Sequence, residues 1–237
     1  MTHILLGDIE IAVELKDIKN IHLSVHPPHG KVTIAAPELM HLDTIRVFAF
    51  NKLQWIRKQQ QAFHDQPREP IREYLPKESH YYLGKRYLLK VLETDDKPQV
   101  ILKHDTIELH TRPSASYDKK KTLMEEWYRS QLKEILPDLI TKWEAIIQVK
   151  SESFSIRKMK TKWGSCNTDK KTILLNLELA KKPLECIEFI VVHELVHLQE
   201  RKHNDNFVAL MDKHLPKWRH IREQLNELPF SYVEWGR

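Results

Sequence analysis

The sequence predicts an α+β fold, with a β-rich N-terminal region at residues 1–115 and a more helical region at residues 116–237. In the first region, short segments alternate apolar and polar residues, which is typical of strands with one buried face. In the second region, apolar residues recur at helical spacing, and one alternating segment indicates a small antiparallel sheet. With 237 residues, 41% hydrophobic and 30% charged, the chain can form one large or two small globular domains.

The N-terminal region contains six segments with a strand pattern and one helical pattern. Strands are expected at residues 9–15, 21–25, 32–34, 81–92 (with a turn near Gly84), 100–103 and 107–110. A turn is expected at residues 27–30, and a proline-containing linker at 66–76. One long helix is expected from the spacing of Leu42, Ile45, Ala49, Leu53 and Ile56.

The C-terminal region begins with a helical pattern over residues 124–146. Pro137 interrupts this pattern, so a kink or two separate helices are expected. Residues 172–179 then alternate, which predicts a strand with one face in the core. Before this strand, Gly164 is expected to permit a tight turn, and after it Pro183 suits the first turn of the next helix.

The next helix carries the main functional signal. From residue 189 to 198 the chain runs Phe-Ile-Val-Val-His-Glu-Leu-Val-His-Leu, in which only His193, Glu194 and His197 are polar. A helix that is apolar on all sides is expected to be buried, and burying these groups without partners is costly. A bound metal ion would remove that cost. Since His193 and His197 share one helix face, they can bind one ion, with Glu194 beside them to act on a metal-bound water.

A catalytic zinc ion usually has three protein ligands and keeps the fourth position for water. His203 is the best candidate for the third ligand. A continuous helix would carry residue 203 roughly 9 Å past His197, so the helix is expected to end around residues 199–202 and the chain to fold back. Glu200 and Asp205 are alternative third ligands, and either could instead orient a ligating imidazole.

Several neighbouring residues have two possible roles. Cys166 could lie beside the metal as an inhibitory ligand or redox gate, or could be a small buried residue, which is favoured. Asn176 could contact the substrate backbone or face solvent. The strand at residues 174–179 could bind an extended substrate by strand addition, or could be an ordinary core strand. Asn204 suits the start of a new helix.

Four segments together closely resemble the YgjP-like metal-dependent hydrolases, which belong with the SprT/Spartan-type zinc metallopeptidases. These segments are KMKTKWGSC, LLNLELAKKP, FIVVHELVHL and residues 203–207. The resemblance is strongest over residues 120–228. It implies a zincin-like catalytic domain with zinc ligands at His193, His197 and His203 and a catalytic carboxylate at Glu194. Lys162 stands where the family usually has Arg, and the resemblance implies no particular substrate.

The predicted function is therefore a zinc-dependent metallopeptidase, with one zinc ion per chain, Glu194 as general base, and a protein or peptide substrate. One alternative is a metal-dependent hydrolase of a non-peptide bond, since the same residues would serve it. Another is a nucleic-acid-associated protein with a structural metal. A structural zinc needs four protein ligands, so Cys166 as a fourth ligand would favour that alternative.

The net charge and the expected cellular location say less about the function. The net charge is +5, and the basic excess is local. It arises from eight residues: Arg157, Lys158, Lys160, Lys162, Lys170, Lys171, Lys181 and Lys182. These residues could attract nucleic acid, but a solvated face of lysines is favoured. Because two cysteines form no disulfide framework, and neither a signal peptide nor a membrane-length apolar run is present, a cytoplasmic location is expected.

Overall fold

The computed structural model describes residues 2–26, 30–65, 72–159 and 162–227. The chain forms two compact units, Met1–Gln66 and Pro67–Arg237. The division expected from the sequence, between residues 115 and 116, lies inside the second unit. The division comes earlier because the strands before residue 112 share one core with the helix that follows: Leu89 and Leu109 are buried in the same cluster as Met124. Most of the linker expected at residues 66–76 lies outside the described residues.

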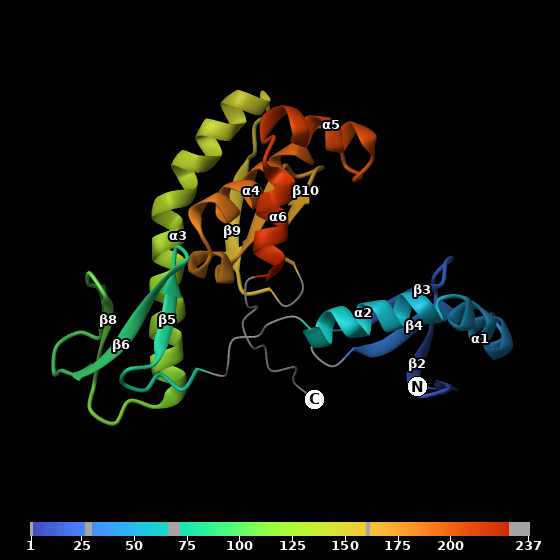
Figure 1. Cartoon of the computed structure of the whole chain (residues 1–237), viewed down its shortest axis with the longest axis horizontal. Coiled ribbons are helices and arrows are strands. Elements are labelled where there is room, and N and C mark those ends of the chain that lie inside the picture. Colours follow the sequence, from blue (N-terminus) through green and yellow to red (C-terminus); the bar gives the residue numbers. More distant parts are fainter. Residues whose placement is uncertain (1, 27–29, 66–71, 160–161, 228–237) are drawn as a thin grey trace. The chain divides into compact units, whose positions relative to one another are not determined.

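The N-terminal unit is a four-stranded sheet with two helices (Figure 1). The sheet order is β1-β2-β4-β3, with β2 parallel to β4 and the other pairs antiparallel. The elements are β1 (Thr2–Leu6), β2 (Ile9–Lys16), β3 (His22–His26), β4 (Lys31–Pro37), α1 (Leu42–Asn51) and α2 (Leu53–Asp65). The single long helix expected here is interrupted at Lys52, yet Ile45 and Ile56 on either side of the break are both buried in the unit's core. The turn expected at residues 27–30 falls mostly outside the described residues.

The second unit begins with another four-stranded sheet, in the order β5-β6-β8-β7. Its strands are β5 (Ser79–Tyr82), β6 (Lys85–Glu93), β7 (Gln99–Leu102) and β8 (Thr106–Thr111). Helix α3 (Tyr117–Ile147) packs on this sheet, with the rings of Tyr82 and Trp127 5.2 Å apart. Pro137 lies inside α3, which is one helix of 31 residues, so the expected alternative of two helices is wrong.

The rest of the second unit is a small sheet and three helices. The strands β9 (Ser153–Arg157), β10 (Gly164–Asn167) and β11 (Thr172–Asn176) form a sheet in the order β10-β11-β9. The sheet is mixed and not purely antiparallel as expected, because β9 and β11 run parallel. The strand predicted to reach residue 179 ends at Asn176, since a 3₁₀-helix, η1 (Leu177–Lys181), follows it.

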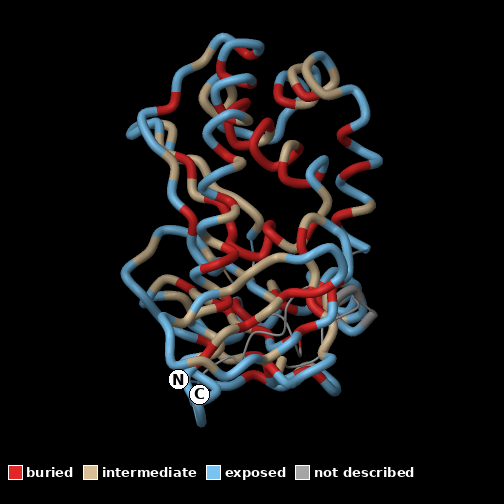
Figure 2. Tube along the Cα trace, turned by 90° about the vertical axis from the view of Figure 1, so that its left-hand side faces the viewer, coloured by how far each residue is buried: buried red, intermediate tan, exposed pale blue. Residues whose placement is uncertain are grey.

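The three helices that complete the unit are α4 (Leu184–Val196), α5 (Asp205–His214) and α6 (Trp218–Glu227). Pro183 lies directly before α4, close to its expected place. Figure 2 shows buried residues alternating with exposed ones along the strands and helices, which is the pattern from which the α+β fold was predicted. No helix in the described part of the chain is long and apolar enough to cross a membrane.

Candidate metal centre

Helix α4 is the buried apolar helix that the sequence predicted. Its side chains Val191, Val192 and Leu195 are fully buried, and Glu194 is only 4% exposed. The helix ends at Val196, a few residues before the expected end, and His197 caps it. The backbone N–H groups of Gln199 and Glu200 both donate to the Val196 carbonyl, which turns the chain away from the helix axis.

This turn brings His203 back to the two histidines of α4. The Nε2 atoms of His203 and His193 lie 3.0 Å apart, and the ring centroids of the three histidines are 4.7 to 4.9 Å apart. Each imidazole offers one nitrogen, and these nitrogens all lie within 4.8 Å of one another. Burial and the two neighbouring histidines lower the pKa of His193 to about 3. The imidazole is therefore neutral at pH 7, as metal binding requires, so the donor set fits a metal ion.

The turn also orients His197. Its Nδ1 lies 3.0 Å from the backbone carbonyl oxygen of Glu200, which leaves Nε2 for a metal. The Glu200 carboxylate accepts from the Lys202 N–H instead, and its hydrogen bonds to Lys202 and Asn204 lower its pKa. Asp205 is exposed at the start of α5. Among the described residues, neither Glu200 nor Asp205 belongs to the group of potential ligands around the histidines.

Phe207 completes the cluster, and its role was missed in the sequence analysis. As predicted, Asn204 caps α5: its side-chain oxygen accepts from the Phe207 N–H at 3.0 Å. The Phe207 ring is 2% exposed and lies 4.9, 4.8 and 4.7 Å from the rings of His193, His197 and His203. A single aromatic ring thus packs against all three imidazoles and restricts their rotation. In the sequence, its spacing from Leu210 and Met211 indicates only that it belongs to a helix.

Glu194 lies against the small sheet. Burial raises the pKa of its carboxyl group to about 8, and the charge of Lys162 acts in the opposite direction. A Cβ atom at Gly164 would lie 2.5 Å from Glu194 Oε1, so any larger residue would displace the carboxylate. Gly164 lies in strand β10 and not in a tight turn as expected. Glycine is needed there because the backbone and the carboxylate approach each other closely.

The surroundings of Cys166 and Asn176 favour a structural role for each side chain. The half-buried Cys166 thiol lines the cleft that also contains the three histidines and Glu194. Burial together with the charge of Glu194 raises the pKa of this thiol to about 11. The thiol is therefore protonated at neutral pH in the metal-free protein, which disfavours nucleophilic attack, and among the described residues Cys166 is not in the group of potential metal ligands. Asn176 is fully buried and neither faces solvent nor lines the cleft. Its amide donates to the carbonyls of Met159 and Lys162, and so fixes the segment before β10.

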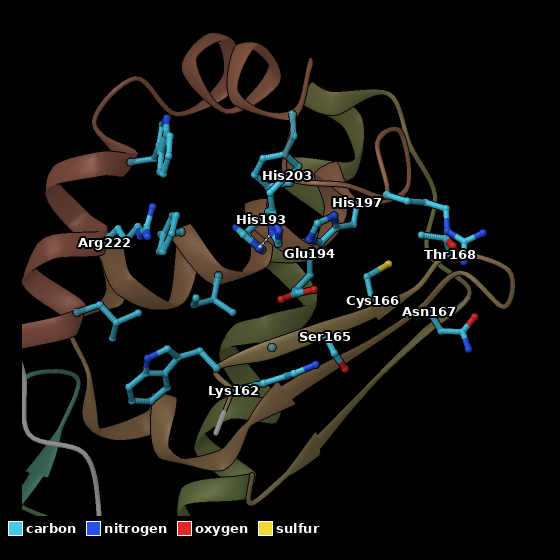
Figure 3. Close-up of a pocket in the computed structure, with 18 of the residues that line it drawn as sticks. Lys162, Ser165, Cys166, Asn167, Thr168, His193, Glu194, His197, His203 and Arg222 are labelled. Atoms are coloured by element: carbon cyan, nitrogen blue, oxygen red, sulfur yellow. Dashed lines mark hydrogen bonds between the residues drawn. The ribbon is translucent and has the colours of Figure 1, made fainter. Parts of the chain in front are cut away.

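The histidines and Glu194 line an open cleft of about 1120 Å³ (Figure 3). Strand β10 forms one wall, and α5 and α6 contribute to the other side. Strand β11 pairs with β9 and β10 on its two sides and has no free edge. An extended substrate therefore cannot add to the strand at residues 174–179, which the sequence suggested as a binding edge. Among the described residues, β10 and β9 are the two edge strands of this sheet, and β10 is the one that borders the cleft.

The chain matches the sequence pattern described as "YgjP-like, metallopeptidase domain" over residues 19–228. The chain belongs to the YgjP-like metallopeptidase family. This confirms the resemblance noted in the sequence, and it identifies the protein as a hydrolytic metalloenzyme. The match covers parts of both compact units: in the N-terminal unit it includes β3, β4, α1 and α2, whereas β1 and β2 lie before it.

Solved structures with some likeness to this YgjP-like chain include two metallopeptidase zymogens. Abylysin of Pyrococcus abyssi has 22% sequence identity and a TM-score of 0.36, and the match covers 38% of this chain and 90% of that chain. Jannalysin of Methanocaldococcus jannaschii has 21% identity and a TM-score of 0.34, with 38% and 91% covered. No protein of curated function matches the chain.

The basic stretch before α4 was expected to be a solvated face of lysines, but in this YgjP-like protein only part of it is solvated. Lys158 pairs with Glu125 and Lys181 pairs with Glu178, each at 2.7 Å. Lys182 is 3% exposed, and its Nζ lies 5.6 Å from the centre of the half-buried Trp163 ring. The remaining described members are exposed: Arg157, Lys162, Lys170 and Lys171. The charge that nucleic acid would meet is therefore smaller than the sequence count indicates.

Replacing Phe207 with Ala is expected to destabilise the metal-free protein by about 3–5 kcal/mol, because it opens a cavity beneath the three imidazoles. Zinc affinity should also fall, since the rings lose their common support. Both quantities can be measured, by urea unfolding in EDTA and by titration against a chromophoric chelator. Phe207→Leu keeps most of the volume and should recover most of the stability. Unchanged zinc affinity in Phe207→Ala would show that the ring does not position the histidines.

Proposed function

We propose that this protein is a zinc-dependent peptidase in which His193, His197 and His203 bind the zinc ion and Glu194 is the general base. The observation that carries the proposal is the cluster of three imidazoles whose candidate ligand nitrogens lie within 4.8 Å of one another, beside a buried carboxylate in an open cleft. Zinc is favoured because three protein ligands with an open fourth position are typical of catalytic zinc sites.

A bound zinc would lower the pKa of a water ligand to around 7 and polarise the carbonyl of the bond to be cleaved. Glu194 takes the proton from this water and later transfers it to the leaving amine. Burial gives its carboxyl group a raised proton affinity, which suits an acceptor that must hold a proton between two steps. The charge of Lys162 favours the ionised form that begins the cycle.

The free edge of β10 supports a peptide substrate. An extended chain can add to an edge strand through main-chain hydrogen bonds, and β10 runs along the cleft beside Glu194. A small non-peptide substrate would make no use of this edge, so we rank a non-peptide hydrolase lower. A structural metal would need a fourth protein ligand, and among the described residues the group of potential ligands contains only the three histidines.

The direct test is the cleavage of an unfolded protein, reduced and alkylated casein, by the zinc-loaded enzyme. Cleavage should disappear when the metal is removed with 1,10-phenanthroline and return when zinc is added. The assay is run with and without single-stranded DNA, because four exposed cations of the basic stretch remain available. Stimulation by DNA would give these cations a partner. An absence of cleavage in every condition, with zinc confirmed as bound, would count against a general peptidase.

A further inference from the structure

Two cationic side chains that line the cleft, those of Lys162 and Arg222, form no hydrogen bond or ion pair with any described residue, and Arg222 is the one on the α6 side. The basic side chains lining the cleft, apart from the histidines, are Lys162, Arg201 and Arg222. Arg201 pairs with Asp169 at 3.5 Å, and the charge of Lys162 acts on Glu194. Arg222 is exposed and forms no hydrogen bond or ion pair with any described residue. Its guanidinium group is therefore free to bind an anion that enters the cleft.

Arg222 lies close to the candidate metal centre. Arg222 and the three histidines line the same cleft. Figure 3 shows Arg222 and Thr168 on opposite sides of the three histidines. A peptide lying along the cleft with its scissile bond at the metal would therefore place a residue on one side of that bond next to Arg222.

The wall around Arg222 is apolar and firmly held. Trp218, Arg222 and Leu225 are spaced so that they share one face of α6, and all three line the cleft. The Trp218 ring stacks on Phe189 of α4 at 6.3 Å and 11°, and its Nε1 donates to Asp212 at 2.8 Å. Trp218 and Leu225 are 7% and 1% exposed, so they anchor α6 in the core and leave the exposed Arg222 side chain at the rim of the cleft.

The other arginine of α6, Arg219, is already paired with a carboxylate, unlike Arg222. Arg219 is bound to the Asp212 carboxylate and lies 4.6 Å from the centre of the Trp218 ring, so its charge is already neutralised. Arg222 has no such partner in the described part of the chain. Guanidinium groups bind carboxylates through two parallel hydrogen bonds, and these charge-assisted bonds are stronger than bonds between neutral groups.

We infer that Arg222 binds a carboxylate of the peptide substrate on the α6 side of the three histidines. The enzyme therefore prefers peptides with an acidic side chain, or a free C-terminus, within a few residues of the cleaved bond. The inference rests on the proposed peptidase function and gives that function a substrate class.

The test uses quenched fluorescent peptides in matched pairs. In one set, a single Glu is moved through the sequence and compared with Gln at the same position. In the other set, a free C-terminal acid is compared with an amide. In one of the two sets, the wild-type kcat/KM should be about tenfold higher for the peptide with the carboxylate than for its uncharged partner, as expected for a charge-assisted hydrogen bond. The set that shows the preference identifies the source of the carboxylate.

Arg222→Gln should reduce the ratio of kcat/KM for the carboxylate peptide to kcat/KM for its neutral partner to about one. Arg222→Lys should keep part of this preference, because lysine retains the charge without the two-pronged geometry. Lys217→Gln is the matched control: it removes the same charge just before α6 but lies outside the residues that line the cleft, so it should keep the wild-type ratio. A ratio near one in wild type, or an undiminished ratio in Arg222→Gln, would overturn the inference.

A binding measurement separates this inference from the peptidase proposal. The anisotropy of the same labelled peptides is measured with zinc-loaded Glu194→Gln, with and without Arg222→Gln. Tighter binding of the carboxylate peptides that depends on Arg222 supports the subsite even if the wild-type enzyme cleaves none of them. Equal binding of both members of every pair overturns it, whatever the hydrolysis assay shows.

Discussion

Replacing Glu194 with Gln is expected to lower kcat for peptide hydrolysis by about 10²–10⁴-fold, the usual contribution of a general base. Gln has nearly the same shape as Glu, so it fits against Gly164 and leaves the three histidines in place. Zinc should therefore remain bound with wild-type stoichiometry. Glu185→Gln is the matched control, because Glu185 is an exposed glutamate in the first turn of the same helix. If Glu194→Gln keeps wild-type activity, Glu194 is not the base.

The same substitution should stabilise the metal-free protein at high pH. The pKa of Glu194 is raised to about 8 in the folded protein, from an ordinary value of 4.5, because burial disfavours the charged form. A carboxyl group of this kind costs stability wherever it is ionised in the unfolded chain. Urea unfolding in EDTA should show no difference between Glu194→Gln and wild type near pH 4, and a difference that grows up to about pH 8. A constant difference across this range would mean that the carboxyl group is not destabilised by burial.

Replacing His203 with Ala is expected to lower zinc affinity by more than about 100-fold. Removing a residue that only orients a ligand costs roughly 10–100-fold, and removing a ligand itself should cost more. Because His203 is exposed, the stability of the metal-free protein should change by only about 0.5 kcal/mol. Zinc affinity is measured by competition with a chromophoric chelator, and stability by urea unfolding in EDTA.

Three further variants identify the third ligand. His220→Ala removes an exposed histidine of α6 that does not line the cleft, so it should bind zinc like the wild type. Glu200→Ala and Asp205→Ala test the two alternatives raised by the sequence. The proposal requires that both keep most of the zinc affinity. If either loses it while His203→Ala does not, the third ligand has been assigned to the wrong residue.

The parts of the site that could be predicted from sequence are those set by local spacing. His193 and His197 are four residues apart in an apolar segment, so one helix face and a buried environment follow directly. The return of the chain to His203 followed from distance alone, since a straight helix would carry that residue too far. Asn204 predicted the start of α5 because short polar side chains cap helices, and its hydrogen bond to Phe207 is present.

The parts that could not be predicted depend on contacts between distant segments. Gly164 looked like a turn residue because nothing in its neighbourhood shows that Glu194, 30 residues later, packs against its Cα. The alternation of Leu175, Leu177 and Leu179 suggested one strand, but all three are buried, and the last two belong to a 3₁₀-helix. A fully buried apolar run has no exposed face from which its period could be determined.

The division into units was also a matter of distant contacts. The strands before residue 112 were grouped with the N-terminal sheet because both are β-rich, but Leu89 and Leu109 share a core with α3. Composition reports which elements form and not which elements pack together. The same limit explains why Arg222 was not noticed: it lies 19 residues beyond His203, and only the packing of α6 beside α4 brings it to the cleft.

The central claim is that three histidines hold one catalytic zinc and leave a position open. A crystal structure of the zinc-loaded wild type, with anomalous differences recorded at the zinc edge, tests it most directly. The account predicts a single zinc ion about 2.0–2.1 Å from one nitrogen each of His193, His197 and His203, with no protein atom in the fourth position. A zinc ion bound elsewhere, or closed by a fourth protein ligand such as Cys166, would contradict it.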